Sequence, residues 1–376
     1  MSARAGLLAG RYLVTGRRGA GLEARDERSG APVLLEELPL PEVVSPYDQL
    51  AAPAGLDEAS GRALAHAAFV AETVPDHPRL CQAFQVFAED GRLWVAGELV
   101  PGQSLAELLR AGPLSPYRAA ELGHDLAAAL SAVHRMGLVH GNVTPMSVTV
   151  CEDGTALLGG LALGAAQEAL CGGPGLEEAG AGVSTALWNP ARVRARDARA
   201  VIVGAVPERW APEQAGVVEG AGLPVGTAAD SWALGVLLHR AVTGEPPFPE
   251  GDAAALIAAV RGGAAYSAPR AAGPLAPLLA RLLDADPLRR PDAVQVRAEL
   301  RELLVRAPEP LEVLPTAAAL LPGQRDERAR VVRREQPVHH AAKRRRGSGA
   351  LLGPLLVGGI VAVVVLVLLL AALTSR

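Results

Sequence analysis

Apolar residues along the chain follow two spacings, which divide it into a strand-rich part and a later helical part. Short apolar runs bounded by turn residues predict strands over 11–15, 31–38 and 93–100, the first two around a glycine-containing turn. Beyond Ser104 the spacing becomes helical and predicts helices over 104–109, 118–136 and 231–244. A small β-rich part followed by a larger α-helical part predicts an α+β fold.

A later apolar run, residues 350–373, has no charged side chain over the length of about 20 residues that a membrane helix needs. The run is apolar on every side, which disfavours a buried core helix and predicts a transmembrane helix. The basic cluster that precedes it, and the three residues that follow, predict a tail-anchored, single-pass protein of the cell inner membrane with a cytoplasmic N-terminal part.

The segment before this run, residues 307–349, is rich in Pro and Arg and has weak apolar periodicity, so we expect a flexible juxtamembrane linker. Its basic cluster either contacts anionic lipid headgroups or serves only as a solvated spacer and topology signal. The cluster consists of Lys343, Arg344, Arg345 and Arg346. No aromatic residues alternate with the arginines, so nucleic-acid binding is not expected.

Composition limits the chemistry that the chain can perform. It has 376 residues, is 50% hydrophobic and carries a formal net charge of -4, which gives no general signature of a polyanion-binding protein. Three widely spaced cysteines without a ligand-type motif argue against a zinc site or a disulfide framework. Lys343 is the single lysine, so no lysine is available to bind a phosphate group before the C-terminal region.

Residues 138–150, LVHGNVTPMSVTV, have the outline of the protein-kinase catalytic loop H-R-D-L-x-x-x-N. Other kinase landmarks follow in the family's order: the hinge-like segment 93–105, the A-P-E of 211–213, Asp230 within AADSWALGVLL, and DPLRRPDA at 286–293. On these motifs the chain resembles the bacterial eukaryotic-like (Hanks-type) serine/threonine protein kinases.

The resemblance covers nearly all of residues 10–306 and implies a two-lobed protein-kinase-like fold. The β-rich N-lobe is expected over about 10–100 and the α-helical C-lobe over about 101–306. It further implies that His140 and Asp230 are structural, with Asp230 bracing the catalytic-loop backbone, and that Arg290 forms an ion pair with Glu213. Breaking one side of a buried pair typically costs about 3–5 kcal/mol, so folding alone explains why these residues are kept.

The same resemblance identifies the positions of the phosphoryl-transfer groups, where the residues lack the required chemistry. Glu36 replaces the lysine of V-A-I-K, and at 4 Å and an effective dielectric of 20 its charge would repel a phosphate by about 4 kcal/mol. Asn142 replaces the catalytic Asp, and an amide is no base near neutral pH. Ser147 and Gly159 replace the two magnesium ligands.

The glycine-rich segment GRRGAG also departs from the kinase pattern. Gly16, Gly19 and Gly21 follow a G-x-x-G-x-G spacing, and a flexible turn is favoured over a phosphate-binding loop. The glutamate of the family's αC helix has two candidates, Glu58 and Glu72.

The activation segment, about 161–211, is longer than the family usually needs, and a solvated strand and loop is favoured there. A docking surface for a phosphorylated partner is a second interpretation of its arginines. These arginines are Arg192, Arg194, Arg196 and Arg199.

The joint loss of lysine, base and both metal ligands predicts a catalytically inactive pseudokinase that acts in signalling as a scaffold or allosteric regulator of a protein partner, either an active kinase or its substrate. Neither a cofactor nor a metal is predicted. The alternative is a weak or atypical serine/threonine kinase, or another nucleotide-dependent transferase, that uses ATP and Mg²⁺ in a rearranged site. Arg17 or Arg18 would then contact the phosphates, and Glu152 or Asp153 would replace a metal ligand.

Overall fold

The computed structural model describes residues 7–41, 58–172, 190–216, 226–263 and 266–306. All of them belong to one compact unit, Met1–Pro310. No helix within these ranges is long and apolar enough to cross a bilayer. The predicted linker, the basic cluster at 343–346 and the predicted membrane helix at 350–373 lie outside the described residues.

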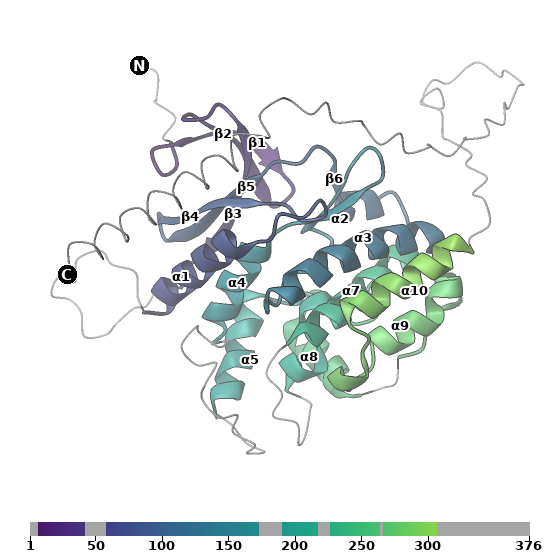
Figure 1. The fold of residues 1–376 in the computed structure, drawn as a ribbon. Helices are drawn as coiled ribbons and strands as arrows, with labels where there is room; N and C mark the ends of the chain where they lie inside the picture. The colour runs from purple at the N-terminus through teal and green to yellow at the C-terminus, as the bar shows by residue number, and fades with distance from the viewer. Residues whose placement is uncertain (1–6, 42–57, 173–189, 217–225, 264–265, 307–376) are drawn as a thin grey trace, which may run out of the picture. The chain divides into compact units, whose positions relative to one another are not determined.

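The N-terminal part is built on a five-stranded antiparallel sheet with the order β1-β2-β3-β5-β4 (Figure 1). Its strands are β1 (Tyr12–Arg18), β2 (Gly21–Asp26), β3 (Pro32–Pro39), β4 (Ala83–Glu89) and β5 (Arg92–Glu98). Side chains alternate between the two faces of a strand. Leu35 and Trp94 therefore pack on one face of the sheet, whereas Leu38 and Val95 pack on the other against two helices.

These two helices are α1 (Glu58–Thr73) and α4 (Leu161–Leu170), which lie against each other (Figure 1). Their contact faces consist mainly of small residues, including Ala63 and Ala67 of α1 and Ala166 of α4. Short side chains allow the helix backbones to approach closely, so α4 completes the core of the sheet-bearing part.

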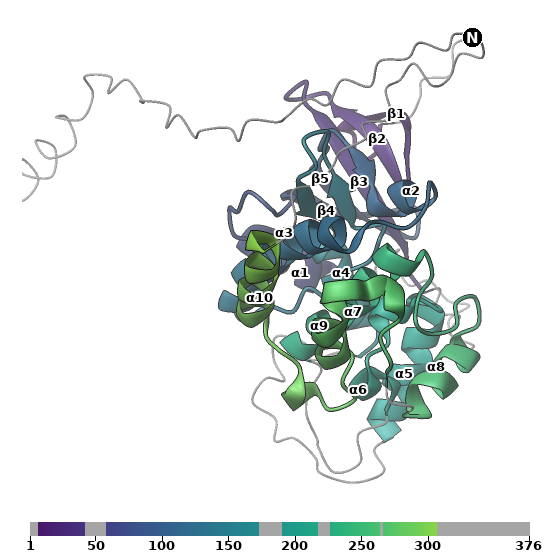
Figure 2. The same cartoon turned by 90° about the vertical axis from the view of Figure 1, so that its right-hand side faces the viewer.

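The C-terminal part is helical, with α3 (Pro116–Arg135) and α7 (Thr227–Thr243) inside it and α10 (Ala293–Val305) packed along α3 (Figures 1 and 2). Ser115 caps α3 by accepting a hydrogen bond from the Arg118 N–H, and Pro116 occupies the first turn, where its missing N–H has no cost. Fully buried leucines of α3 and α7 form the core here, each contributing roughly 1.5–3 kcal/mol.

The shorter elements connect these layers. They are β6 (Gln103–Ser104), β7 (Val148–Val150) and β8 (Ala156–Leu158), which form a small second sheet, and the helices α2 (Leu105–Leu109), α5 (Pro190–Ile202), α6 (Pro212–Ala215), α8 (Ala253–Arg261), α9 (Ala276–Leu282), η1 (Pro207–Arg209), η2 (Arg270–Leu275) and η3 (Pro287–Arg289).

The predicted α+β arrangement and all three predicted strands are present, and the three predicted helices correspond to α2, α3 and α7. The strand-and-loop prediction for 161–211 is wrong, because the described parts of that segment form α4, α5 and η1. Helix α4 forms there because its alanine-rich face is buried against α1 and the sheet.

Candidate functional site

The carboxylate of Asp230 holds the start of the loop at 140–147 in place. Asp230, buried on α7, accepts hydrogen bonds from the backbone N–H groups of His140 and Gly141, each at 2.8 Å, and lies 2.8 Å from Nε2 of His134. Burial alone would raise the pKa of Asp230, but the hydrogen bond and charge of His134 hold that pKa below its ordinary value. Asp230 therefore braces the loop backbone as predicted.

His140 is fully enclosed beneath this loop. Burial lowers the pKa of its imidazole to about 4, so the ring is neutral near pH 7. Its Nδ1 accepts a hydrogen bond from the Asn142 N–H at 3.3 Å, which ties the ring to the loop that it supports. This geometry fits a structural residue.

The predicted ion pair between Glu213 and Arg290 is present. Two nitrogens of the buried Arg290 guanidinium each lie 2.8 Å from a carboxylate oxygen of Glu213. The guanidinium also donates to the carbonyls of Ala228 and Asp284 and stacks over the Trp232 ring at 5.1 Å. The pair therefore joins α6, α7 and the segment before α10.

The positions that would carry phosphoryl transfer come together at Gly160, where α4 begins with φ +76°. A Cβ placed there would lie 2.7 Å from Asn142 Nδ2, 3.4 Å from Glu36 Oε1 and 3.5 Å from Ser147 Cβ. The adjacent Gly159 donates its N–H to the Ser147 carbonyl at 2.8 Å. The structure thus brings all four predicted positions to one place, although they come from three separate segments.

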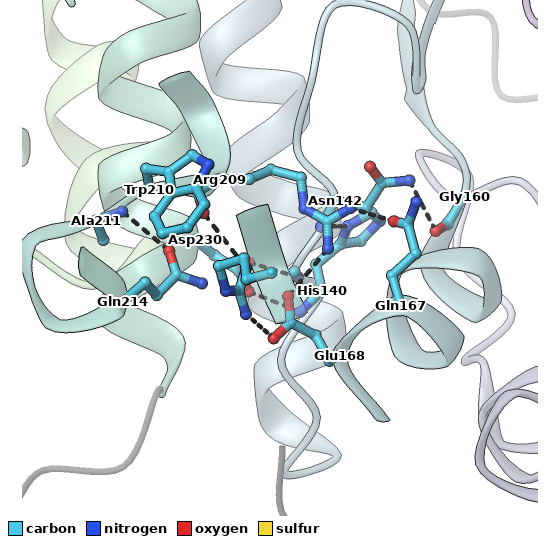
Figure 3. A network of polar contacts seen from close by, with 12 residues as sticks. His140, Asn142, Gly160, Gln167, Glu168, Arg209, Trp210, Ala211, Gln214 and Asp230 are labelled. Atoms are coloured by element: carbon cyan, nitrogen blue, oxygen red, sulfur yellow. Dashed lines mark hydrogen bonds and ion pairs between the residues drawn. The ribbon is translucent and has the colours of Figure 1, made fainter. Parts of the chain in front are cut away.

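The polar side-chain groups of Asn142 and Ser147 form hydrogen bonds within the loop and with Gly160 at the start of α4. The Asn142 side-chain amide donates to the Gly160 carbonyl at 3.2 Å (Figure 3). The Ser147 hydroxyl donates to the Asn142 carbonyl at 2.6 Å and accepts from the Thr144 N–H at 3.0 Å. Both side chains therefore stabilise the loop conformation, and neither supplies a base.

Glu36 on β3 lies at the same junction and has no recorded hydrogen bond or ion pair with another described residue. Burial raises the pKa of its carboxyl to about 7. It lines a cavity of about 60 Å³ together with Arg18, Cys81, Glu98 and Met146. Cavities that hold drug-sized ligands measure roughly 300–1,000 Å³, so this space is small for a nucleoside triphosphate.

The hairpin formed by β1 and β2 contributes Arg18 to the lining of this cavity. Gly19, at φ +57°, lies so close to the loop at 140–147 that a Cβ on Gly19 would be 3.0 Å from Met146 Cε. The Arg18 guanidinium donates to the Gly102 carbonyl in the segment between the two parts. Gly16 belongs to β1 and Gly21 pairs with Arg18, so the three glycines form a tight hairpin.

The cavity does not fit a magnesium–triphosphate complex. Its lining offers one cation, Arg18, whose guanidinium already contacts Gly102, and it also includes the acidic side chains of Glu36 and Glu98. No group of three or more metal-ligating side chains occurs within the described residues. Of the residues of the alternative site, Arg18 lines the cavity, whereas Glu152 and Asp153 form an exposed turn between β7 and β8.

Neither candidate for the αC glutamate faces the cavity. Glu58 is exposed and pairs with Arg62 one turn along α1, and Glu72 is exposed near the end of that helix. The buried face of α1 consists of Ser60, Ala63, Ala67 and Val70. Helix α1 therefore directs no carboxylate toward β3.

A largely buried charge cluster that sequence reasoning missed ties α4 to α5 and η1 beside the loop. Glu168 of α4 pairs with Arg209 of η1 at 2.9 Å and with Arg199 of α5 (Figure 3 shows Glu168 beside Arg209). Its Cγ would lie 3.3 Å from a Cβ at Gly141, which has φ +64°, so the absence of a side chain there makes room for Glu168.

This cluster corrects one interpretation of the activation-segment arginines. Arg199 is buried and points inward to Glu168, so it cannot contribute to a docking surface. Arg196 contacts Asp197, and Arg194 is exposed on α5. The partners of Glu168 lie 31 and 41 positions away in the sequence, and no local sequence pattern predicts the pairing.

Comparison with known proteins points to serine/threonine protein kinases. The chain is 28% identical over 223 residues to the serine/threonine-protein kinase PknJ of Mycobacterium tuberculosis, covering 57% of this chain and 33% of that protein. It is 30% identical to PkaA and to PkaB of Streptomyces coelicolor, covering 60% and 61% of this chain. The chain spans 37% and 50% of these two relatives. No family model matches the chain.

Proposed function

We propose that this chain is a membrane-anchored, protein-kinase-like protein that is catalytically inactive and acts in signalling as a scaffold or allosteric regulator of a protein partner. Similarity to bacterial serine/threonine kinases supports the kinase-like part of the proposal. A kinase-like structural framework is supported by the loop that Asp230 braces, by the Glu213–Arg290 pair and by the strand order of the sheet. The chemistry of the cavity supports catalytic inactivity.

The single observation that carries the proposal is the meeting of Glu36, Asn142 and Ser147 at Gly160. Asn142 offers an amide and Ser147 a hydroxyl already bound within its own loop, so the positions of the kinase base and of one magnesium ligand supply neither function. Phosphoryl transfer relies almost entirely on positioning and charge stabilisation of the phosphates. A cavity that is small and lined by carboxylates opposes both.

The apolar run at 350–373 and the preceding basic residues support a single-pass inner-membrane protein with its kinase-like part in the cytoplasm. A protein of this kind would act on partners near the membrane, such as an active kinase or a kinase substrate. Nucleic acid is not among the proposed partners.

The alternative function, a weak or atypical kinase, is favoured by one observation: Arg18 lines the cavity and is close enough to reach an anion there once its contact with Gly102 is broken. Phosphate transfer would then depend on Arg18. The alternative must also explain how Glu36 tolerates a triphosphate at the same cavity.

The two functions are separated by a phosphoryl-transfer assay on the full chain purified in detergent, with radiolabelled ATP, Mg²⁺ or Mn²⁺, and a mixture of generic protein acceptors. The proposal expects no incorporation above that of a reaction without the chain. Incorporation that requires Arg18 would establish the alternative. Cross-linking in native membranes, with the destabilised Arg290→Met variant as a control, would then identify the partner.

A further inference from the structure

The exposed side of α10 and the adjoining end of α3 form a surface that combines unpaired arginines with apolar side chains. We call it the α3–α10 basic face and define it by Arg135, Met136, Val294, Arg297, Arg301 and Val305. Met136, Val294 and Val305 are 50%, 60% and 79% exposed. Positions 294, 297, 301 and 305 recur at helical spacing, so they share the outer side of α10.

The arginines of this face lie near one another although they come from different elements. Helix α10 packs along α3, with Gly123 of α3 close enough to Leu300 that a Cβ there would be 3.0 Å from Leu300 Cδ1. Burial and then nearby cations lower the pKa of His77, and the first two cations are Arg135 and Arg297. Both Arg297 and Arg301 lower the pKa of the neighbouring His124 after burial.

The positive charge of this face is not neutralised within the described part of the chain. Arg135, Arg297 and Arg301 have no recorded hydrogen bond or ion pair with a described residue. The nearby carboxylates are engaged elsewhere: Asp125 with Arg79 at 2.8 Å, Glu299 with Arg281, and Glu302 with Arg306 at 3.7 Å. An anionic partner would therefore meet arginines that need not give up an existing contact.

We infer that the α3–α10 basic face binds the surface of an anionic lipid bilayer. Arginines interspersed with exposed apolar side chains on one side of a helix are typical of interfacial membrane contact, in which the charges attract acidic headgroups and the apolar groups enter the boundary. The face is the outer side of a helix. The cavity beside α10 lies near Tyr117 and Leu303 and includes none of these six residues.

A bilayer fits this face better than an acidic or phosphorylated peptide does. Peptide recognition relies on grooves and on arginines that converge on one site. The sequence beyond α10 carries an apolar run predicted to span a bilayer, and a tether of this kind raises the effective concentration of lipid at the domain. The inference rests on the proposed anchor only because the anchor would keep the domain close to a bilayer.

The test uses the full chain reconstituted into vesicles of phosphatidylcholine, with or without phosphatidylglycerol, each with a trace of lipid bearing a photoactivatable headgroup. Mass spectrometry measures the cross-link yield on peptides covering 293–306. The yield should be severalfold higher with phosphatidylglycerol and should fall with added salt. An Arg297→Gln, Arg301→Gln double variant should lose about fivefold for each arginine.

The matched control is an Arg261→Gln, Arg270→Gln double variant, which removes two exposed arginines of α8 and η2 that likewise have no recorded ion pair within the described residues. It should cross-link like the unaltered chain. Equal yields in neutral and anionic vesicles, or equal losses in both double variants, would overturn the inference. So would binding of an added acidic peptide that the Arg297 and Arg301 changes abolish without a loss of lipid cross-links.

Resistance of vesicle association to alkaline extraction tests the anchor separately. If the chain is extracted, the proposed anchor fails, and co-sedimentation of the same chain with anionic against neutral vesicles then decides the basic face. Stronger binding to anionic vesicles that requires Arg297 and Arg301 would support it. Equal binding to both would refute it.

Discussion

Replacing Glu36 by Gln should stabilise the protein, and the gain should depend on pH. An unfolded glutamate loses its proton near pH 4.5, whereas burial at the cavity raises the pKa of folded Glu36 to about 7. Between these values the unfolded chain has released the proton and the folded chain still holds it, so raising the pH favours unfolding. Glu36 therefore reduces stability progressively from about pH 4.5 to about pH 7.

The size of the effect follows from the two pKa values. Their difference, from 4.5 to about 7, corresponds to about 3 kcal/mol at roughly 1.4 kcal/mol per pKa unit. This figure is an upper limit, because the Glu36 side chain keeps some contact with solvent. Gln has the same shape without the charge, so the variant should match the unaltered chain near pH 4.5 and exceed its stability near pH 8.

Thermal melts of the full chain in detergent, recorded from pH 4.5 to pH 8, would measure the gain, which should reach several degrees at the alkaline end. Glu37→Gln is the matched control, because Glu37 points to the opposite face of β3 and pairs with Arg92 at 3.2 Å. A Glu36→Gln gain that is the same at both ends of the range would refute the placement of an uncompensated carboxyl at the cavity.

Three further substitutions test the framework around the site. Arg290→Met should lower the free energy of unfolding by about 3–5 kcal/mol in urea titrations, because it leaves Glu213 buried without a partner; an unchanged midpoint would contradict the pairing. Glu168→Gln should cost a similar amount and accelerate hydrogen exchange in α4, since it leaves Arg209 uncompensated, and unaltered exchange would show that the cluster does not hold α4. Gly141→Ala should cost about 1–2 kcal/mol by thermal melts through its left-handed φ of +64°, and a neutral result would count against the reported loop conformation.

The framework was predictable where apolar spacing or a motif with a physical role marks it. Strand β3 has alternating buried residues and α3 has a long apolar stripe, so both were found within a few residues of their bounds. Glu213 and Arg290 lie 77 positions apart, and only the resemblance paired them.

Other elements gave a weaker signal because their packing depends on distant partners. Strand β2 has few strongly apolar residues, the apolar residues of β4 do not alternate regularly with polar ones, and α1 and α4 are rich in small residues that give no clear stripe. The alanine content of α4 was nevertheless a usable sign of a helix, since alanine has the highest helix propensity. Burial of Arg199 could not be predicted, because it depends on Glu168 in another helix.

The cavity likewise has features that the sequence predicts and features that depend on distant contacts. Sequence reasoning identified Glu36, Asn142, Ser147 and Gly159 as positions without phosphoryl-transfer chemistry, and the structure places them at one junction. The small volume of the cavity and the approach of the β1–β2 turn to Met146 depend on contacts across separate segments. No local pattern specifies these distances.

Titration of the full chain with ATP, followed by thermal unfolding with and without Mg²⁺, tests the central proposal of an inactive kinase-like domain most directly. A ligand that binds only the folded state at a hundred times its Kd stabilises that state by about 2.7 kcal/mol, which a melt detects easily. The account predicts no saturable, magnesium-dependent rise in Tm. A rise that saturates with ATP and requires Mg²⁺ would contradict it.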